Sequence, residues 1–125
     1  MLDIRSWPRR FKDTAAGEKT WRECLQLYGL TEETVADFKG SPLDRIEPVA
    51  AVKIPIIVVC GDADDVVSLA ENTAVLEKRY RALGGPIEVR IKPGANHHPH
   101  SLKDPAPIVD FIMRCAGSGA ENQVR

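Results

Sequence analysis

The sequence predicts an α/β fold in which strand, helix, strand and helix follow one another over residues 53–116. The stretch from Ile54 to Cys60 is continuously apolar and rich in β-branched residues, a pattern typical of a strand covered on both faces of a parallel sheet. Residues 87–91 alternate apolar and charged side chains, which indicates a strand at or near a sheet edge. A right-handed crossover makes these two strands parallel neighbours in one sheet.

The first part of the chain, residues 1–52, contains short helical patterns separated by glycine and proline. The first pattern is expected to end at Gly29, after four apolar residues at helical spacing: Trp21, Cys24, Leu25 and Tyr28. Thr31 is a suitable N-cap for a second short helix, and residues 43–51 predict an irregular helical turn interrupted at Pro48. This part of the chain is therefore expected to be helical.

Capping residues set the expected ends of the two helices in the second part. Ser68 and Glu71 form a capping-box pattern at the start of one helix, and the pair Gly84–Gly85 ends it. Asp104 precedes a proline at the first position of the last helix. The apolar stripe of that helix consists of Ile108, Phe111, Ile112 and Cys115. Residues 117–125 are expected to form a frayed tail.

Composition and charge exclude several classes of protein. The 125 residues and 13.8 kDa correspond to one domain. The 17 Lys and Arg against 18 Asp and Glu give a net charge of −1, which supplies no basic field for nucleic acid. No apolar run approaches the roughly 20 residues of a membrane span, so we expect no membrane partner. No targeting segment is visible either, so we expect a cytoplasmic protein, provided that Met1 is the genuine N-terminus. The three cysteines have no C-x-x-C spacing, which argues against a disulfide scaffold or a cysteine zinc site.

Two polar loops follow the predicted strands directly. Residues 61–67 contain three aspartates, and residues 93–100 contain all three histidines of the chain. Ligand sites in parallel α/β sheets lie at the carboxyl ends of the strands, and neighbouring strands are about 4.8 Å apart. An aspartate from one loop can therefore reach a histidine from the other, fix its tautomer and stabilise its protonated form. The alternative for the acidic loop is a solvated turn that caps the next helix.

The three histidines, His97, His98 and His100, lie within four residues of one another. A metal site is the natural alternative to acid–base chemistry, because imidazole is a common ligand of zinc and copper. Adjacent histidines on a loop stiffened by Pro99 seldom all face one ion, however, and no clear carboxylate completes the set. We therefore expect neither a metal nor a cofactor, and keep a histidine-cluster metal-binding protein as an alternative.

The same two loops carry a resemblance to a known family. Residues 54–67 read as a proline, an apolar strand and G-x-x-D-x-V-V, and residues 92–97 read as K-P-G-x-x-H. Together, in this order and with a helix and a strand between them, they resemble the acid and histidine motifs of the α/β-hydrolase superfamily, over about residues 43–115. The resemblance implies that Asp64 is the acid and His97 the general base of a catalytic triad, with Asp62 and His98 as the competing residues.

The resemblance also implies an organisation of the chain. Residues 1–52 would be a helical lid-side segment, and residues 53–116 the C-terminal βαβα part of an α/β-hydrolase domain. The nucleophile of this family is a serine on a G-x-S-x-G elbow that precedes the acid and the histidine. No such elbow occurs around any serine of the chain, which are Ser6, Ser41, Ser68, Ser101 and Ser118. The loop that forms the oxyanion hole is missing as well.

These observations predict the C-terminal portion of a serine-type hydrolase, an esterase by resemblance, in which the chain alone lacks the nucleophile and is inactive. The expected partners are a small-molecule ester in the complete protein, and either a second copy of the chain or the missing N-terminal half. Cys60 is expected to be an inert buried thiol rather than a replacement nucleophile. The alternative is a non-catalytic fold remnant that serves as an interaction or self-association module, because two strands alone leave sheet edges unpaired.

Overall fold

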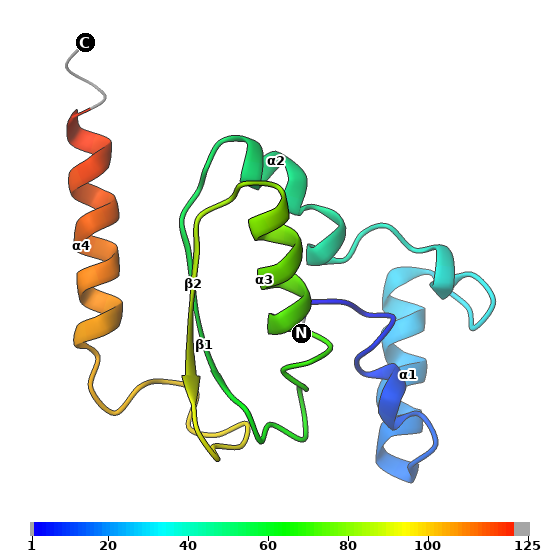
Figure 1. The fold of residues 1–125 in the computed structure, drawn as a ribbon. Coiled ribbons are helices and arrows are strands. Elements are labelled where there is room, and N and C mark those ends of the chain that lie inside the picture. Colours follow the sequence, from blue (N-terminus) through cyan, green and yellow to red (C-terminus); the bar gives the residue numbers. More distant parts are fainter. Residues whose placement is uncertain (1, 122–125) are drawn as a thin grey trace.

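The structure, a computed structural model, describes residues 2–121 of the chain. Within these residues helices alternate with a small parallel sheet, so the fold is of the mixed α/β kind (Figure 1). The elements are α1 (Ala15–Tyr28), α2 (Ile46–Ala51), β1 (Ile56–Gly61), α3 (Thr73–Ala82), β2 (Ile87–Lys92) and α4 (Ala106–Glu121). Short 3-10 turns occur at Arg9–Phe11, Val35–Asp37 and Pro42–Asp44.

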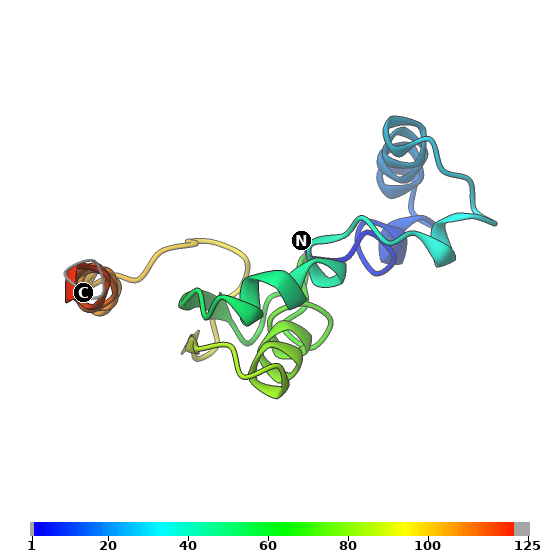
Figure 2. The ribbon, with the colours of Figure 1, turned by 90° about the horizontal axis from the view of Figure 1, so that it is seen from above.

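The sheet consists of β1 and β2, which pair in parallel with Ile56 opposite Ile87 and Gly61 opposite Lys92. This confirms the predicted parallel pair and the strand–helix–strand–helix order. Helices α2 and α3 lie on one side of the sheet and α4 on the other, as Figures 1 and 2 show. The expectation that β1 is covered on both faces is wrong, because residues 56–60 are all half-exposed. Only the side of the sheet that faces α3 is closely packed.

The main hydrophobic core lies between the sheet and helices α2 and α3. Tyr80 of α3 is completely buried at its centre, and its hydroxyl donates a hydrogen bond of 2.6 Å to the backbone oxygen of Ile54. The other buried members are Leu43, Ile46, Ala50, Leu76 and Ile87. Helix α3 therefore fixes the position of both strands. The ring of Tyr80 packs against Ile87 of β2, and its hydroxyl binds Ile54, which directly precedes Pro55 and β1.

A second, smaller hydrophobic cluster lies under α1 and is formed by Ile4, Trp21, Leu25 and Val35. Helix α1 ends where predicted, because Gly29 adopts the left-handed conformation with φ of 64°. The N-terminal segment joins the two clusters. The backbone N–H of Leu2 donates to the side chain of Asn72 at the start of α3, and Arg5 pairs with Asp44 at 2.8 Å.

The predicted start of α3 is wrong. Ser68 and Glu71 do not form a capping box, and the helix begins at Thr73, four residues later than predicted, with Asn72 rather than Ser68 at its N-cap position. The backbone oxygen of Ser68 instead accepts hydrogen bonds from the backbone and side-chain nitrogens of Asn72, so residues 68–72 form turns. The carboxylate of Glu71 pairs with Arg10 of the N-terminal segment at 3.2 Å. Contacts with residues distant in sequence have replaced the local helix start.

Two expectations for the first part of the chain also need correction. Thr31 and Thr34 exchange hydrogen bonds between side chain and backbone, as an N-cap would, but only a 3-10 turn at Val35–Asp37 follows. Pro48 does not interrupt the helix around it. It lies in the first turn of α2, where its missing N–H has no partner within the helix to lose.

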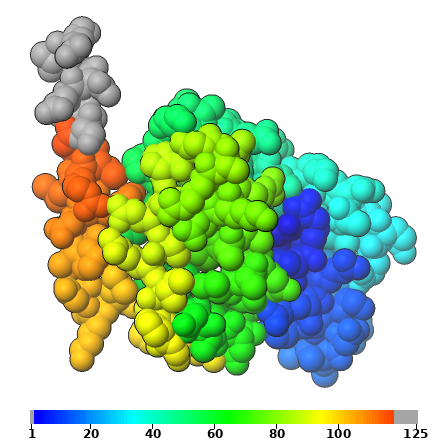
Figure 3. Space-filling view, viewed as in Figure 1, coloured from blue at the N-terminus to red at the C-terminus, as the bar shows by residue number. Residues whose placement is uncertain are grey.

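Helix α4 begins as predicted, because the carboxylate of Asp104 accepts a hydrogen bond of 3.0 Å from the backbone of Ala106. It continues to Glu121, so the part of the expected frayed tail at residues 117–121 is helical, and residues 122–125 lie outside the described residues. Its predicted apolar stripe is only partly covered, and Ile112 is 56% exposed. Figure 3 shows α4 along one flank of the molecule. No helix within residues 2–121 is both long enough and apolar enough to cross a membrane.

Candidate active site

The acidic loop after β1 and the histidine loop after β2 leave the sheet side by side. Gly61 and Lys92, the last residues of the two strands, are opposite each other in the register. The backbone N–H of Ala63 donates to the backbone oxygen of Ala95 at 3.1 Å. The carboxylate of Asp62 accepts a hydrogen bond of 2.6 Å from the N–H of Gly94. The two loops are therefore tied together by backbone and side-chain contacts at the carboxyl edge of the sheet, as predicted.

Gly61 allows the histidine loop to come this close. A Cβ atom at position 61 would lie 2.0 Å from the backbone oxygen of Ala95 and 2.8 Å from that of Asn96. Both distances are far below van der Waals contact, and backbone atoms have little freedom to move aside. A glycine at the end of β1 is therefore required for the loops to meet.

Asp64 and His97 form a hydrogen-bonded pair across the two loops. Nδ1 of His97 lies 2.9 Å from Oδ2 of Asp64, and only 11% of the Asp64 side chain is exposed against 27% of that of His97. The other carboxylate oxygen accepts hydrogen bonds from the backbone of Val66 and Val67, at 2.9 and 2.7 Å. In all three interactions the carboxylate of Asp64 accepts the hydrogen bond.

These donors set the ionisation of Asp64. Burial by itself raises the pKa of the carboxyl group, but the hydrogen bonds from His97, Val67 and Val66 outweigh burial and hold the pKa below its usual value. The group is therefore ionised at neutral pH and can only accept hydrogen bonds. Nδ1 of His97 must then carry the proton that it shares with Asp64, which leaves Nε2 as the nitrogen available for chemistry.

Asn96 holds the backbone on both sides of this pair. Its side-chain oxygen accepts a hydrogen bond of 2.6 Å from the N–H of His97 and one of 3.3 Å from the N–H of Asp65. The sequence reasoning did not assign a role to this residue. The available signal was an asparagine directly before the histidine, since asparagine side chains commonly bind nearby backbone groups in loops.

The structure gives the competing residues other positions. Asp62 is exposed and uses its carboxylate to hold Gly94, on the other loop. His98 does not contact a carboxylate among the described residues; its ring lies edge-on to that of His97, with centroids 4.9 Å apart. Of the four residues that the sequence singled out, the structure brings Asp64 and His97 into direct contact.

A cavity of about 280 Å³ opens beside the pair and is lined by residues of both loops, both strands and α3, among them Cys60, Asp64, Thr73, Lys92, His97 and His100. Cys60 is half-buried rather than buried as expected, so its thiol reaches this cavity. Burial raises the pKa of the thiol above its usual value. The group is therefore protonated at neutral pH and is a poor nucleophile.

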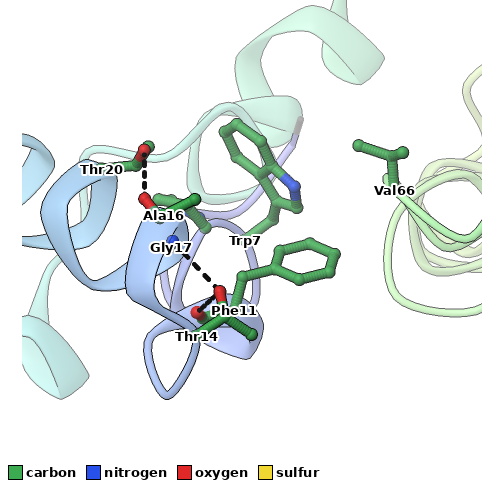
Figure 4. Close-up of a pocket in the computed structure, with 8 residues that line it drawn as sticks. Trp7, Phe11, Thr14, Ala16, Gly17, Thr20 and Val66 are labelled. Atoms are coloured by element: carbon green, nitrogen blue, oxygen red, sulfur yellow. Dashed lines mark hydrogen bonds between the residues drawn. The ribbon is translucent and has the colours of Figure 1, made fainter.

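A separate apolar pocket of about 300 Å³ lies between the N-terminal part of the chain and the acidic loop. In Figure 4 the rings of Trp7 and Phe11 lie on one side of it and Val66 on the other. The indole N–H of Trp7 is buried and has no hydrogen-bond partner among the described residues. The backbone N–H of Val66 binds the carboxylate of Asp64, so the wall of this pocket is connected to the Asp64–His97 pair. The sequence reasoning missed this pocket because its walls are distant in the chain.

Comparisons with known proteins add no family to this geometry: no family model matches the chain, and neither a curated protein nor a solved structure matches it.

Proposed function

We propose that this chain is the C-terminal portion of a serine-type α/β-hydrolase that acts on carboxylic esters, with Asp64 as the triad acid and His97 as the general base. One observation carries the proposal. Nδ1 of His97 lies 2.9 Å from Oδ2 of Asp64, across two loops that follow adjacent parallel strands. No other histidine is paired with a carboxylate within residues 2–121. This edge of the sheet is also where ligand sites of open α/β sheets are found.

The pair has the chemistry that a triad requires. In a Ser-His-Asp triad the histidine takes the proton of the serine hydroxyl and returns it to the leaving group, and the aspartate orients the ring and stabilises the imidazolium. The ionised Asp64 holds the proton on Nδ1 of His97, so that Nε2 can act as the base. His97 is partly exposed and lines the adjacent cavity, which leaves room for a hydroxyl group beside its ring.

The attacking group is missing from this arrangement. No serine donates a hydrogen bond to His97 in the part of the chain that the structure describes. The protonated thiol of Cys60 does not replace it. In α/β-hydrolases the triad serine precedes the acid and the histidine in the chain, so the proposal places it in sequence before Met1. The isolated chain is then expected to be inactive towards esters.

The apolar pocket beside Val66 supports an ester as the substrate class. Its walls are almost entirely carbon, and its volume of about 300 Å³ fits a small apolar group. In the proposed enzyme this pocket holds the acyl or alcohol part of the ester.

The hydrogen bond between His97 and Asp64 can be tested without activity. Proton NMR of the chain is expected to show a strongly deshielded exchangeable proton on a histidine Nδ1. Asp64→Ala should remove the signal, and the matched control Asp62→Ala should retain it, because Asp62 binds only the backbone of Gly94. A signal that survives Asp64→Ala would contradict the assignment of the acid.

The catalytic role is tested by activity in two forms of the protein. The isolated chain should not hydrolyse an activated short-chain ester such as p-nitrophenyl acetate. The chain joined in frame to the coding sequence upstream of Met1 should hydrolyse it, lose turnover with His97→Ala, and retain it with the control His98→Ala. Turnover by the isolated chain that His97→Ala abolishes would overturn the claim that the nucleophile is missing. An upstream sequence without a serine elbow would overturn the proposal as a whole.

A second candidate function, an association module, is favoured by apolar side chains that are exposed on α4 and β2. Val109, Ile112 and Met113 of α4 are 51%, 56% and 66% exposed, and Ile91 of β2 is 51% exposed. The described sheet also has two strands only, each with an unpaired edge. Size-exclusion chromatography with light scattering should then find a dimer or larger assembly. A well-folded monomer would count against this candidate.

A further inference from the structure

We propose that His97, His98 and His100 form a binding site for one divalent transition-metal ion of the zinc class. One nitrogen from each of the three rings can be chosen so that all three lie within 4.8 Å of one another. The site shares the ring of His97 with the proposed triad, but its tests do not depend on the proposed hydrolase function, because His98 and His100 have no part in the triad. It also departs from the expectation drawn from the sequence, which left this loop without a metal.

The objection from the sequence was that adjacent histidines seldom face one ion. In the structure the three rings do gather: the centroids of His97 and His100 are 4.7 Å apart, and those of His98 and His100 are 4.3 Å apart. A tetrahedral ion with bonds of about 2.0 Å needs nitrogens about 3.3 Å apart. The side chains of His98 and His100 are exposed, so their rings have room to rotate towards this spacing.

The second objection was that no carboxylate completes the set. In the structure Asp64 supports a ligand instead of binding the ion itself. It accepts the hydrogen bond from Nδ1 of His97 and thereby fixes the tautomer of that ring. A carboxylate behind a ligating histidine raises the basicity of the ligand and orients it. The fourth position on the ion is then open to water, as in other sites with three protein ligands.

The electrostatic surroundings both favour and oppose a cation. The ammonium group of Lys92 lines the adjacent cavity and donates to the backbone oxygen of Pro99, so it opposes the positive charge of the ion. The ionised Asp64 offsets this charge.

The donor set selects the class of ion. Three imidazole nitrogens suit zinc, copper and nickel, whereas calcium and magnesium require oxygen ligands. An ion on His97 would also occupy Nε2, the nitrogen that the proposed general base needs. Metal binding and base catalysis at His97 are therefore mutually exclusive uses of one ring.

Isothermal titration calorimetry of the chain, with any affinity tag removed, is the direct test, with zinc as the probe and magnesium as the control ion. We expect one zinc per chain with submicromolar affinity and no heat from magnesium. His98→Ala and His100→Ala should each weaken zinc binding more than about tenfold, and Asp64→Asn about 10- to 100-fold. Both histidines are exposed, so these variants should retain the far-UV circular dichroism spectrum of the wild type.

Cys60 provides the matched control, because its thiol lines the adjacent cavity and could bind zinc itself. Cys60→Ser should keep the wild-type affinity, and the cobalt-loaded chain should show no thiolate charge-transfer absorption. Absent or only micromolar zinc binding, unchanged affinity in both histidine variants, or loss of binding in Cys60→Ser would each overturn the three-histidine site. None of these results depends on esterase activity, so they leave the proposed hydrolase function to its own tests.

Discussion

The two ends of the parallel sheet differ in kind although the same two strands form both. At the amino end, Tyr80 is completely buried and hydrogen-bonded to Ile54, and Ile87 is packed beside it. At the carboxyl end, Asp64 and His97 meet beside an open cavity, held by hydrogen bonds between the two loops. Apolar burial stabilises the first end, whereas directional polar contacts shape the second. Substitutions at the amino end should therefore change global stability most, and those at the carboxyl end should mainly change the site.

The largest effect is expected from Tyr80→Ala. Removal of a completely buried aromatic ring leaves a cavity between α3 and the sheet, so the free energy of unfolding should fall by about 3–5 kcal/mol. Urea unfolding followed by circular dichroism measures the loss. The other tyrosine of the chain is the matched control: Tyr28 is 52% exposed, and Tyr28→Ala should cost less than about 1 kcal/mol. Equal losses would show that the core is not where the structure places it.

Gly61→Ala should have the next largest effect. Its new Cβ would lie 2.0 Å from the backbone oxygen of Ala95, so the loops must separate at a cost of about 2 kcal/mol. The separation should also weaken the deshielded proton signal of His97, which links stability to the geometry of the site. Gly117→Ala is the control, because a Cβ there meets no atom within 4 Å and should cost nothing. Retention of the His97 signal in Gly61→Ala would contradict the role assigned to the glycine.

A smaller effect, which depends on pH, is expected from Asp64→Asn. The pKa of Asp64 in the folded chain lies below its usual value of 3.8, so the ionised carboxylate favours the folded state. That contribution is fully present above the unfolded-state pKa and is lost as the pH falls through the lowered folded-state pKa. Urea unfolding should find the wild type more stable than the variant by about 1 kcal/mol at pH 7, with the difference shrinking below pH of about 4. A difference that grew towards acid pH would contradict the ionised pair.

The smallest effect is expected at the salt bridge between Arg114 of α4 and Glu88 of β2. The bond is 2.6 Å long, but the two side chains are 57% and 36% exposed, and solvent screens the attraction. Glu88→Gln should lower the free energy of unfolding by less than about 0.5 kcal/mol in the same urea assay. Glu88 also pairs with Arg90 at 3.0 Å, so a loss above about 1 kcal/mol would show that its two ion pairs together stabilise the fold more than their exposure indicates.

The parts of the fold that the sequence predicted correctly depend on local patterns. Both strands, the end of α1 at Gly29 and the start of α4 after Asp104 are set by residues adjacent in the chain. The start of α3 could not be predicted, because Asn72 binds the backbone of Leu2, 70 residues away. The sequence of residues 68–71 gives no sign of that long-range contact.

The sequence predicted which two loops form the candidate site, but not which of their side chains are in contact. Asp62 and Asp64 are both on the acidic loop, and spacing alone does not choose between them. The choice is made by the hydrogen bond from Gly94, which engages Asp62, and by the close approach of Ala95 to Gly61. The contribution of Asn96 and the gathering of the three histidines also depend on the path of the second loop. These are properties of three-dimensional backbone geometry.

The separation of the two hydrophobic clusters gives the protein a built-in pair of spectroscopic reporters. Both tryptophans of the chain lie in its first part, Trp21 buried in the cluster under α1 and Trp7 beside the apolar pocket. Indole emission therefore follows the first part of the chain, and tyrosine absorbance of a Tyr28→Phe variant follows Tyr80 in the core beneath the sheet. Coincident unfolding curves from the two signals would identify one cooperative unit, and displaced curves would identify two.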